Sequence, residues 1–173
     1  MTDADQFEAF VREYQDMVFA TAVRLLANPA EAEDIAQTVF LRAFERFASI
    51  ATSPTAAGWL KTVTTNLCLN HLSRYRARWQ FFSESDGVDY AATIAAPEAA
   101  DAADTSARHE RLERAVQGLP DHQRVPLVLF HFEDMTYKEI AATLGISLAK
   151  VRTDIHRGRE ALKRAMTGTY EPD

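Results

Sequence analysis

The segment from residue 148 to residue 165 collects side chains that could bind phosphate and read nucleic-acid bases. Its acids are only Asp154 and Glu160. Lysine and arginine donate hydrogen bonds to phosphate oxygens and to the O6 and N7 atoms of guanine. The whole chain has a net charge of −6, so a basic segment indicates a local binding surface rather than a general affinity for anions. A solvated charged helix is the structural alternative. The basic residues of the segment are Lys150, Arg152, Arg157, Arg159, Lys163 and Arg164.

The residues before this segment predict the elements that position it. Thr136 and Glu139 have the spacing of a capping box, which starts a helix. Gly145 tolerates the left-handed conformation that ends one, and Ser147 is suited to cap the next helix. The apolar face of that next helix is predicted to contain Leu148, Val151, Ile155 and Leu162. Two helices joined by a short glycine turn form a helix-turn-helix, whose second helix fits the major groove of DNA.

The non-core side of this second helix supplies the predicted DNA contacts. Asp154 is the acidic residue among these basic and polar ones, and its carboxylate would repel phosphate. We expect Asp154 either to accept a hydrogen bond from cytosine N4 or to orient a neighbouring arginine. The predicted contacts are Lys150, Arg152, Thr153, His156, Arg157 and Arg159.

The rest of the chain predicts an all-α protein with two small helical domains. Apolar residues at three- and four-residue spacing indicate helices over residues 7–26, from Pro29 to about residue 47, and over 57–79. Asn28 is suited to cap the second helix. Residues 82–107 hold six acids and no base, and we expect a flexible acidic linker over 80–107. The predicted domains are therefore 1–79 and 108–173.

Composition excludes several other classes of protein. A single cysteine, Cys68, cannot form an intramolecular disulfide and indicates a reducing compartment. The N-terminus lacks the cations of a signal peptide, and no apolar run approaches the ~20 residues that span a bilayer. We expect a soluble cytoplasmic protein without membrane insertion. The five histidines have no metal-ligand spacing and no glycine-rich phosphate loop is present, so we predict neither a catalytic residue, a metal nor a cofactor.

At this point the sequence resembles the extracytoplasmic-function (ECF) sigma factors of the sigma-70 family. "LPDHQRVPLVLFHFEDMTYKEIAATLGISLAKVRTDIHRGREALK" resembles region 4, which reads the minus-35 promoter element. "FEAFVREYQDMVFATAVRLLANPAEAEDIAQTVFLRAFERF" is similar to regions 2.1 and 2.2, and "AAGWLKTVTTNLCLNHLSRYRAR" to regions 2.3 and 2.4. The resemblance implies a transcription initiation factor that binds core RNA polymerase and promoter DNA, with an anti-sigma factor as regulator.

The resemblance also implies roles for residues in the N-terminal half. The polymerase partners would be the coiled coil of the largest subunit and the flap. Residues expected to contact the coiled coil are Asp34, Gln37, Thr38, Leu41 and Arg42, whereas Ile35, Val39, Phe40 and Phe44 are expected in the core. Residues expected to hold the separated minus-10 strand are Lys61, Asn66, Asn70, Arg74 and Arg76, with Trp59 in the core.

Three positions depart from the family pattern, and a rival reading stays open. Asn70 stands where an aspartate is common, Ser73 where an arginine is common, and Asp154 at a position that is often basic. A dimeric helix-turn-helix regulator that binds duplex DNA without core polymerase is the alternative function. Because the chain ends at "TGTYEPD", we expect no additional C-terminal sensory domain.

Overall fold

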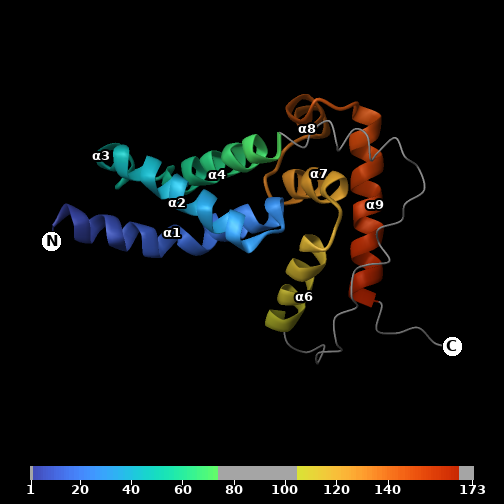
Figure 1. Cartoon of the computed structure of the whole chain (residues 1–173), viewed down its shortest axis with the longest axis horizontal. Coiled ribbons are helices and arrows are strands. Elements are labelled where there is room, and N and C mark those ends of the chain that lie inside the picture. The colour runs from blue at the N-terminus through green and yellow to red at the C-terminus, as the bar shows by residue number, and fades with distance from the viewer. Residues whose placement is uncertain (1, 74–104, 168–173) are drawn as a thin grey trace. The chain divides into compact units, whose positions relative to one another are not determined.

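The computed structural model describes residues 2–73 and 105–167, and every regular element in these ranges is an α-helix (Figure 1). The helices form two compact units, one with α1 to α4 and the other with α6 to α9. The all-helical prediction is therefore confirmed for both units. The predicted boundary at residue 79 and nearly all of the predicted linker lie outside the described residues.

The first unit is built on a long antiparallel pair of helices whose ends are set by local hydrogen bonds. Helix α1 (Asp3–Leu26) ends at Ala27, which takes a left-handed conformation with φ of 53°. Asn28 then caps α2 (Pro29–Glu45), as predicted, because its Oδ1 accepts hydrogen bonds from the amides of residues 30 and 31. A short helix α3 (Phe47–Ile50), which the sequence did not predict, leads to α4 (Ala56–Ser73).

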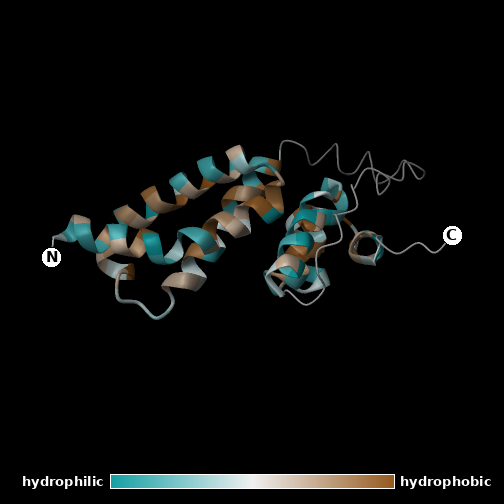
Figure 2. Ribbon diagram, turned by 90° about the horizontal axis from the view of Figure 1, so that it is seen from below, coloured by the Kyte–Doolittle hydropathy of each residue, from teal (hydrophilic) through white to brown (hydrophobic). Residues whose placement is uncertain are grey.

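An apolar core holds α1, α2 and α4 together. Val18, Val39 and Leu60, one from each helix, are fully buried. Near the N-terminus of α1, the rings of Phe7, Phe10 and Phe47 contact one another edge to face or stacked, with centroids 5.2–6.3 Å apart. In Figure 2, brown hydrophobic and teal hydrophilic residues alternate along the helices, as expected for amphipathic helices.

The second unit has the predicted helix-turn-helix at its C-terminal end. Helix α6 (Thr105–Gln117) begins three residues before the expected start of the domain, and α7 (Asp121–His131) follows. The capping box of α8 (Tyr137–Leu144) is present: Thr136 Oγ1 accepts from the Glu139 amide at 3.1 Å, and the Thr136 amide donates to the Glu139 carboxylate at 3.3 Å. Gly145 is left-handed, with φ of 68°, as predicted.

Helix α9 (Leu148–Thr167) packs closely on α7 through its only glycine. A Cβ atom placed on Gly158 would lie 2.9 Å from Cδ1 of Leu127, which is itself buried. The Ser147 side chain caps the start of α9 by accepting from the Lys150 amide at 3.1 Å. The close packing of α7 on α9 at Gly158 determines which side of α9 remains accessible. None of the helices in the two described ranges has both the length and the hydropathy that crossing a bilayer requires.

Candidate DNA and polymerase interfaces

The accessible side of α9 carries most of the predicted DNA contacts. Val151, Ile155 and Gly158 are buried at helical spacing, and the opposite side faces solvent. Thr153 also donates its hydroxyl to the Ala149 carbonyl at 3.0 Å, which leaves its methyl group and both lone pairs of the hydroxyl oxygen for a partner. The exposed members of the predicted set are Arg152, Thr153, His156, Arg157 and Arg159.

Arg159 is held in place by α7 rather than extending freely. Its Nε donates a hydrogen bond to Nε2 of His131 at 3.0 Å, and its guanidinium lies 5.4 Å from the centroid of the Phe130 ring. Burial, together with the nearby Arg159 charge, lowers the pKa of His131. His131 therefore stays neutral and can accept the bond, while the two terminal nitrogens of Arg159 keep their donors for an anion.

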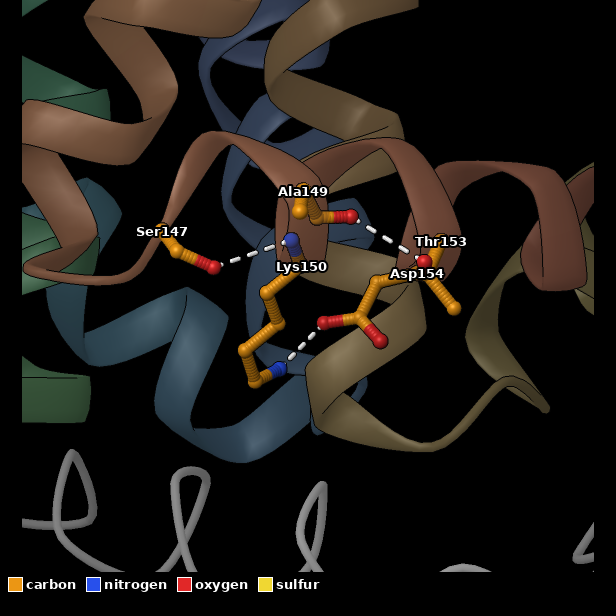
Figure 3. Close-up of polar contacts among 5 residues, drawn as sticks. All are labelled: Ser147, Ala149, Lys150, Thr153 and Asp154. Carbon is orange, nitrogen blue, oxygen red and sulfur yellow. Dashed lines mark hydrogen bonds and ion pairs between the residues drawn. The ribbon is translucent and has the colours of Figure 1, made fainter.

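Lys150 differs from the other five predicted contacts because its ammonium forms an ion pair with Asp154, one turn further along α9 (Figure 3). The side chains of Lys150 and Asp154 are 18% and 3% exposed, respectively. A groove of DNA cannot reach the Asp154 carboxylate in this position. Of the two roles expected for Asp154, acceptance from cytosine does not fit this burial, and its ion-pair partner is Lys150 rather than the arginine that the other role requires.

On α4 the described minus-10 candidates divide between two sides of the helix. Asn66 and Asn70 are exposed and lie one turn apart on the same side. Lys61 is half-buried, and nine residues of helix place it about half a turn away from Asn70. Trp59 is half-buried and packs against the core, as predicted. Arg74 and Arg76 lie outside the described residues.

The outer face of α2 presents most of the predicted polymerase contacts to solvent. Asp34, Gln37, Leu41 and Arg42 are exposed. Thr38 is half-buried and donates its hydroxyl to the carbonyl of Asp34 at 3.1 Å. Leu41 is 66% exposed, which is unusual for a large aliphatic side chain on a helix that also contributes to the core.

Phe44 extends this apolar exposure, and its predicted place in the core is wrong. It is 61% exposed and contacts Phe7 only along one edge, with the ring centroids 5.1 Å apart. The other three residues of the predicted core set fit better: Val39 is fully buried, and Ile35 and Phe40 are half-buried against the core. Phe44 and Leu41, together with Phe19 of α1, border an open groove of about 840 Å³ between α1 and α2.

Cys68 is completely buried within α4, which fits the prediction of a packed rather than a nucleophilic thiol. Across residues 2–73 and 105–167, no three His, Cys, Asp or Glu side chains come together in a way that could hold a metal ion.

Comparison with known proteins assigns both units to one family. Residues 10–78 match the family model described as sigma-70 region 2, and residues 109–162 match sigma-70 region 4. The ECF RNA polymerase sigma factor SigW of Bacillus subtilis is 31% identical over 95% of this chain and 90% of its own length. The chain belongs to the ECF sigma factors of the sigma-70 family. It is thus a non-catalytic subunit that directs RNA polymerase in transcription initiation.

Other relatives of this sigma factor agree with the assignment. The RNA polymerase sigma factor YlaC of Bacillus subtilis is 30% identical over 100% of this chain and 99% of its own length. The ECF sigma factor SigE of Mycolicibacterium smegmatis is 35% identical over 91% of this chain, which spans 60% of that protein. Matches to both regions, in order, exclude the alternative of a dimeric regulator with a helix-turn-helix alone.

A solved structure shows the same fold. This sigma factor resembles the sigma factor RpoE of Bartonella quintana, which was crystallised with the anti-sigma factor NepR, with a TM-score of 0.51. The two sequences are 22% identical, and the similarity covers 93% of this chain and 96% of that one. At this identity the likeness supports the helical fold of the two regions.

Three site features of this sigma factor were missed by reasoning from sequence. The sequence did contain a signal for Asp154, since that residue lies three positions after Val151 and four before Gly158, on the buried stripe. The second feature is His122 of α7, which acts electrostatically on Asp154; its nearness depends on how α7 packs against α9, and the sequence of α9 alone carries no signal for it. Phe44 carries no local signal of exposure, because a phenylalanine at helical spacing is usually core.

Proposed function

We propose that region 2 of this sigma factor binds the coiled coil of the polymerase largest subunit through the outer face of α2 and the adjoining α1–α2 groove. The support is the combination of exposed polar side chains with large exposed apolar ones on a single helix face. Such a mixed surface suits a helix that docks on a partner and leaves it again. The residues are the five predicted contacts Asp34, Gln37, Thr38, Leu41 and Arg42, joined by Phe44 and Phe19.

The same proposal assigns promoter reading to two further helices. Asn66 and Asn70 of α4, with Lys61, Arg74 and Arg76, would hold the separated minus-10 strand. The exposed side of α9 would lie in the minus-35 major groove, while the polymerase flap binds region 4. We infer a region 2 domain over 1–79 and a region 4 domain over 108–173, joined by the acidic segment 80–107.

The observation that carries the DNA assignment is the division of α9 into a buried stripe and an exposed side with Arg152, Thr153, His156 and Arg157. Side chains of these types can bond bases and phosphates in the major groove. Arg157→Ala is therefore expected to weaken promoter binding by ~1–3 kcal/mol if it contacts a base, or to lower the salt slope by about one if it contacts a phosphate.

The test uses holoenzyme reconstituted from core RNA polymerase and the full chain. A primary sigma factor serves as competitor, and promoter fragments are selected from a random library by the wild-type holoenzyme. Arg164→Ala is the matched control, because Arg164 is an exposed arginine of α9 outside the proposed contact set. If Arg157→Ala and Arg164→Ala bind the selected promoters equally well at every salt concentration, the assignment of the reading face is wrong.

We also propose that an anti-sigma factor regulates this protein, on the basis of its family and of the anti-sigma factor that accompanies the RpoE relative. A regulator that covers the α1–α2 groove would exclude polymerase from the same surface. A candidate anti-sigma factor should inhibit transcription by the holoenzyme, and adding excess Phe44→Asp chain should fail to relieve that inhibition. If the Phe44→Asp chain relieves the inhibition as strongly as the wild-type chain does, the anti-sigma factor binds somewhere other than the α1–α2 groove.

A further inference from the structure

The ion pair at the start of the helix that is proposed to read DNA joins a half-buried lysine, Lys150, to a buried aspartate, Asp154. Figure 3 shows the Lys150 side chain folded back so that its ammonium meets the Asp154 carboxylate. The Lys150 amide is also occupied, because it donates to the Ser147 hydroxyl. Both ends of this residue therefore contribute to internal structure, in contrast to Arg152 and Thr153, which are exposed on the same turns.

The surroundings of the pair show why the carboxylate needs a cation. Asp154 is 2% exposed, and burial raises the pKa of its carboxyl, whereas the bond from Lys150 acts in the opposite direction. His122 of α7 and Arg157 of α9 also act electrostatically on Asp154. Burial lowers the pKa of His122, so at neutral pH this imidazole contributes little positive charge. Lys150 is thus the principal cation that neutralises Asp154 in this packed region.

The pair lies where α9 rests on α7. Asp154 is on the same stripe as Val151 and Gly158, and the close approach of α7 at Gly158 occurs one turn beyond it. A buried carboxylate without its cation would favour conformations of α9 that expose it to water. Movement of this first part of α9 would displace Arg152 and Arg157, which depend on the helix for their position.

We propose that Lys150 and Asp154 are positioning residues that form an internal, electrically neutral pair within α9, keep its buried stripe free of an unpaired charge, and make no contact with DNA. The inference depends on the proposed function only in that α9 reads DNA. It removes Lys150 from the contact set and leaves reading to the five exposed residues of that set, Arg152, Thr153, His156, Arg157 and Arg159. The cation at position 150 then serves the fold of region 4 instead of neutralising a phosphate.

The first experiment measures hydrogen exchange of α7 and α9 in the full chain. Lys150→Met keeps an unbranched side chain that is one atom shorter but leaves the Asp154 carboxylate unpaired, so amide exchange in α9 should accelerate by at least ~100-fold. Asp154→Val combined with Lys150→Met replaces the pair with apolar groups of similar total volume. This double variant should return exchange to within ~10-fold of the wild type, as apolar replacement of a buried ion pair commonly does.

The second experiment measures promoter binding by holoenzymes that contain the same chains, using the fragments selected by the wild type. The double variant should retain wild-type affinity within ~3-fold and an unchanged dependence of log K on log salt. Arg152→Met is the matched control: it should leave hydrogen exchange unchanged and reduce the salt slope by about one if Arg152 contacts phosphate.

Two results would overturn the inference. One is a salt slope reduced by about one in the double variant while its α9 amides remain protected, which would make Lys150 a phosphate contact. The other is equally fast amide exchange in the single and double variants, which would show that the lysine does not act by neutralising the Asp154 carboxylate. The exchange comparison contains no DNA, so it decides the structural part even if α9 proves not to read promoters.

Discussion

The exposed ring of Phe44 allows a quantitative prediction about polymerase binding. Phe44 is 61% exposed, and a phenylalanine side chain has a surface of about 200 Å², so roughly 120 Å² is available to a partner. At about 25 cal/mol per Å², covering this area contributes up to ~3 kcal/mol, which corresponds to about 100-fold in Kd. We expect Phe44→Ala to weaken binding of the full chain to core polymerase by 10- to 100-fold, as an order of magnitude.

The assay is competition between the variant and labelled wild-type chain for core RNA polymerase. The stability of the free variant should fall by no more than ~1.5 kcal/mol, because Phe44 loses mainly its edge contact with Phe7. Phe10→Ala is the contrasting variant: Phe10 is 6% exposed in the same aromatic cluster, and its removal should cost ~3–5 kcal/mol of stability. An unchanged Kd for Phe44→Ala would refute the reasoning that this ring belongs to the polymerase surface.

Four further predictions concern the stability of regions 2 and 4. Gly158→Ala should lower the unfolding free energy of region 4 by up to ~2 kcal/mol, because its new methyl group would crowd the buried α7 contact more than the gain in helix propensity offsets. Gly58 of α4 has open space around it, so Gly58→Ala should raise the unfolding free energy of region 2 by ~0.5–1 kcal/mol. Denaturant unfolding measures both changes, the decrease at Gly158 and the increase at Gly58. Thr136→Ala should cost about 1 kcal/mol and speed hydrogen exchange in the eight-residue α8, and unaltered exchange there would contradict the capping role. Burial lowers the pKa of His122 from its usual 6.5, so the unfolded chain binds the extra proton first and region 4 should lose stability as pH falls below 6.5. His122→Gln should flatten that dependence in thermal melts between pH 5 and 8, leaving the part due to His131, whose pKa is also lowered.

Helix ends were the features that the sequence predicted best. Asn28, Thr136 with Glu139, and Gly145 all act where their side chains or backbone conformations were expected to act. Each of these signals is local, because a capping oxygen bonds an amide two or three residues away. The four-residue helix α3 has no comparable side-chain cap, and no sequence pattern indicated it.

Burial on α2 was harder to predict because small residues occupy the closest helix contacts. Ala32, Val39 and Ala43 form the most buried stripe of α2, and two of these three are alanines. A prediction that gives most weight to large apolar side chains places the core face of α2 too close to Phe44, which lies one residue past that stripe. Which side of a helix is covered depends on how near its neighbour can approach, and that distance is a tertiary property.

The function could be predicted from sequence because two regions resemble one family in the same order. The individual residues that contact DNA could not be predicted in the same way. Arg152 and Lys150 are both cations on the first turns of the predicted reading helix, and their composition does not distinguish them. Their difference arises from Asp154, which turns one of the two inward. A carboxylate on an apolar stripe is a reason to look for its cation one turn away on the same helix.

The buried Lys150–Asp154 pair also constrains how this sigma factor can change over generations. Loss of the lysine alone strands a buried carboxylate, and loss of the aspartate alone leaves a lysine without its charge partner in a mostly covered position. A lineage that exchanges this pair for another combination therefore has to pass through a less stable region 4, or acquire both substitutions together. Arg152 and Thr153 face solvent and can be replaced one at a time without this loss of stability. Under the proposed assignment of reading to these residues, promoter preference can therefore change without disturbing the pair beneath them.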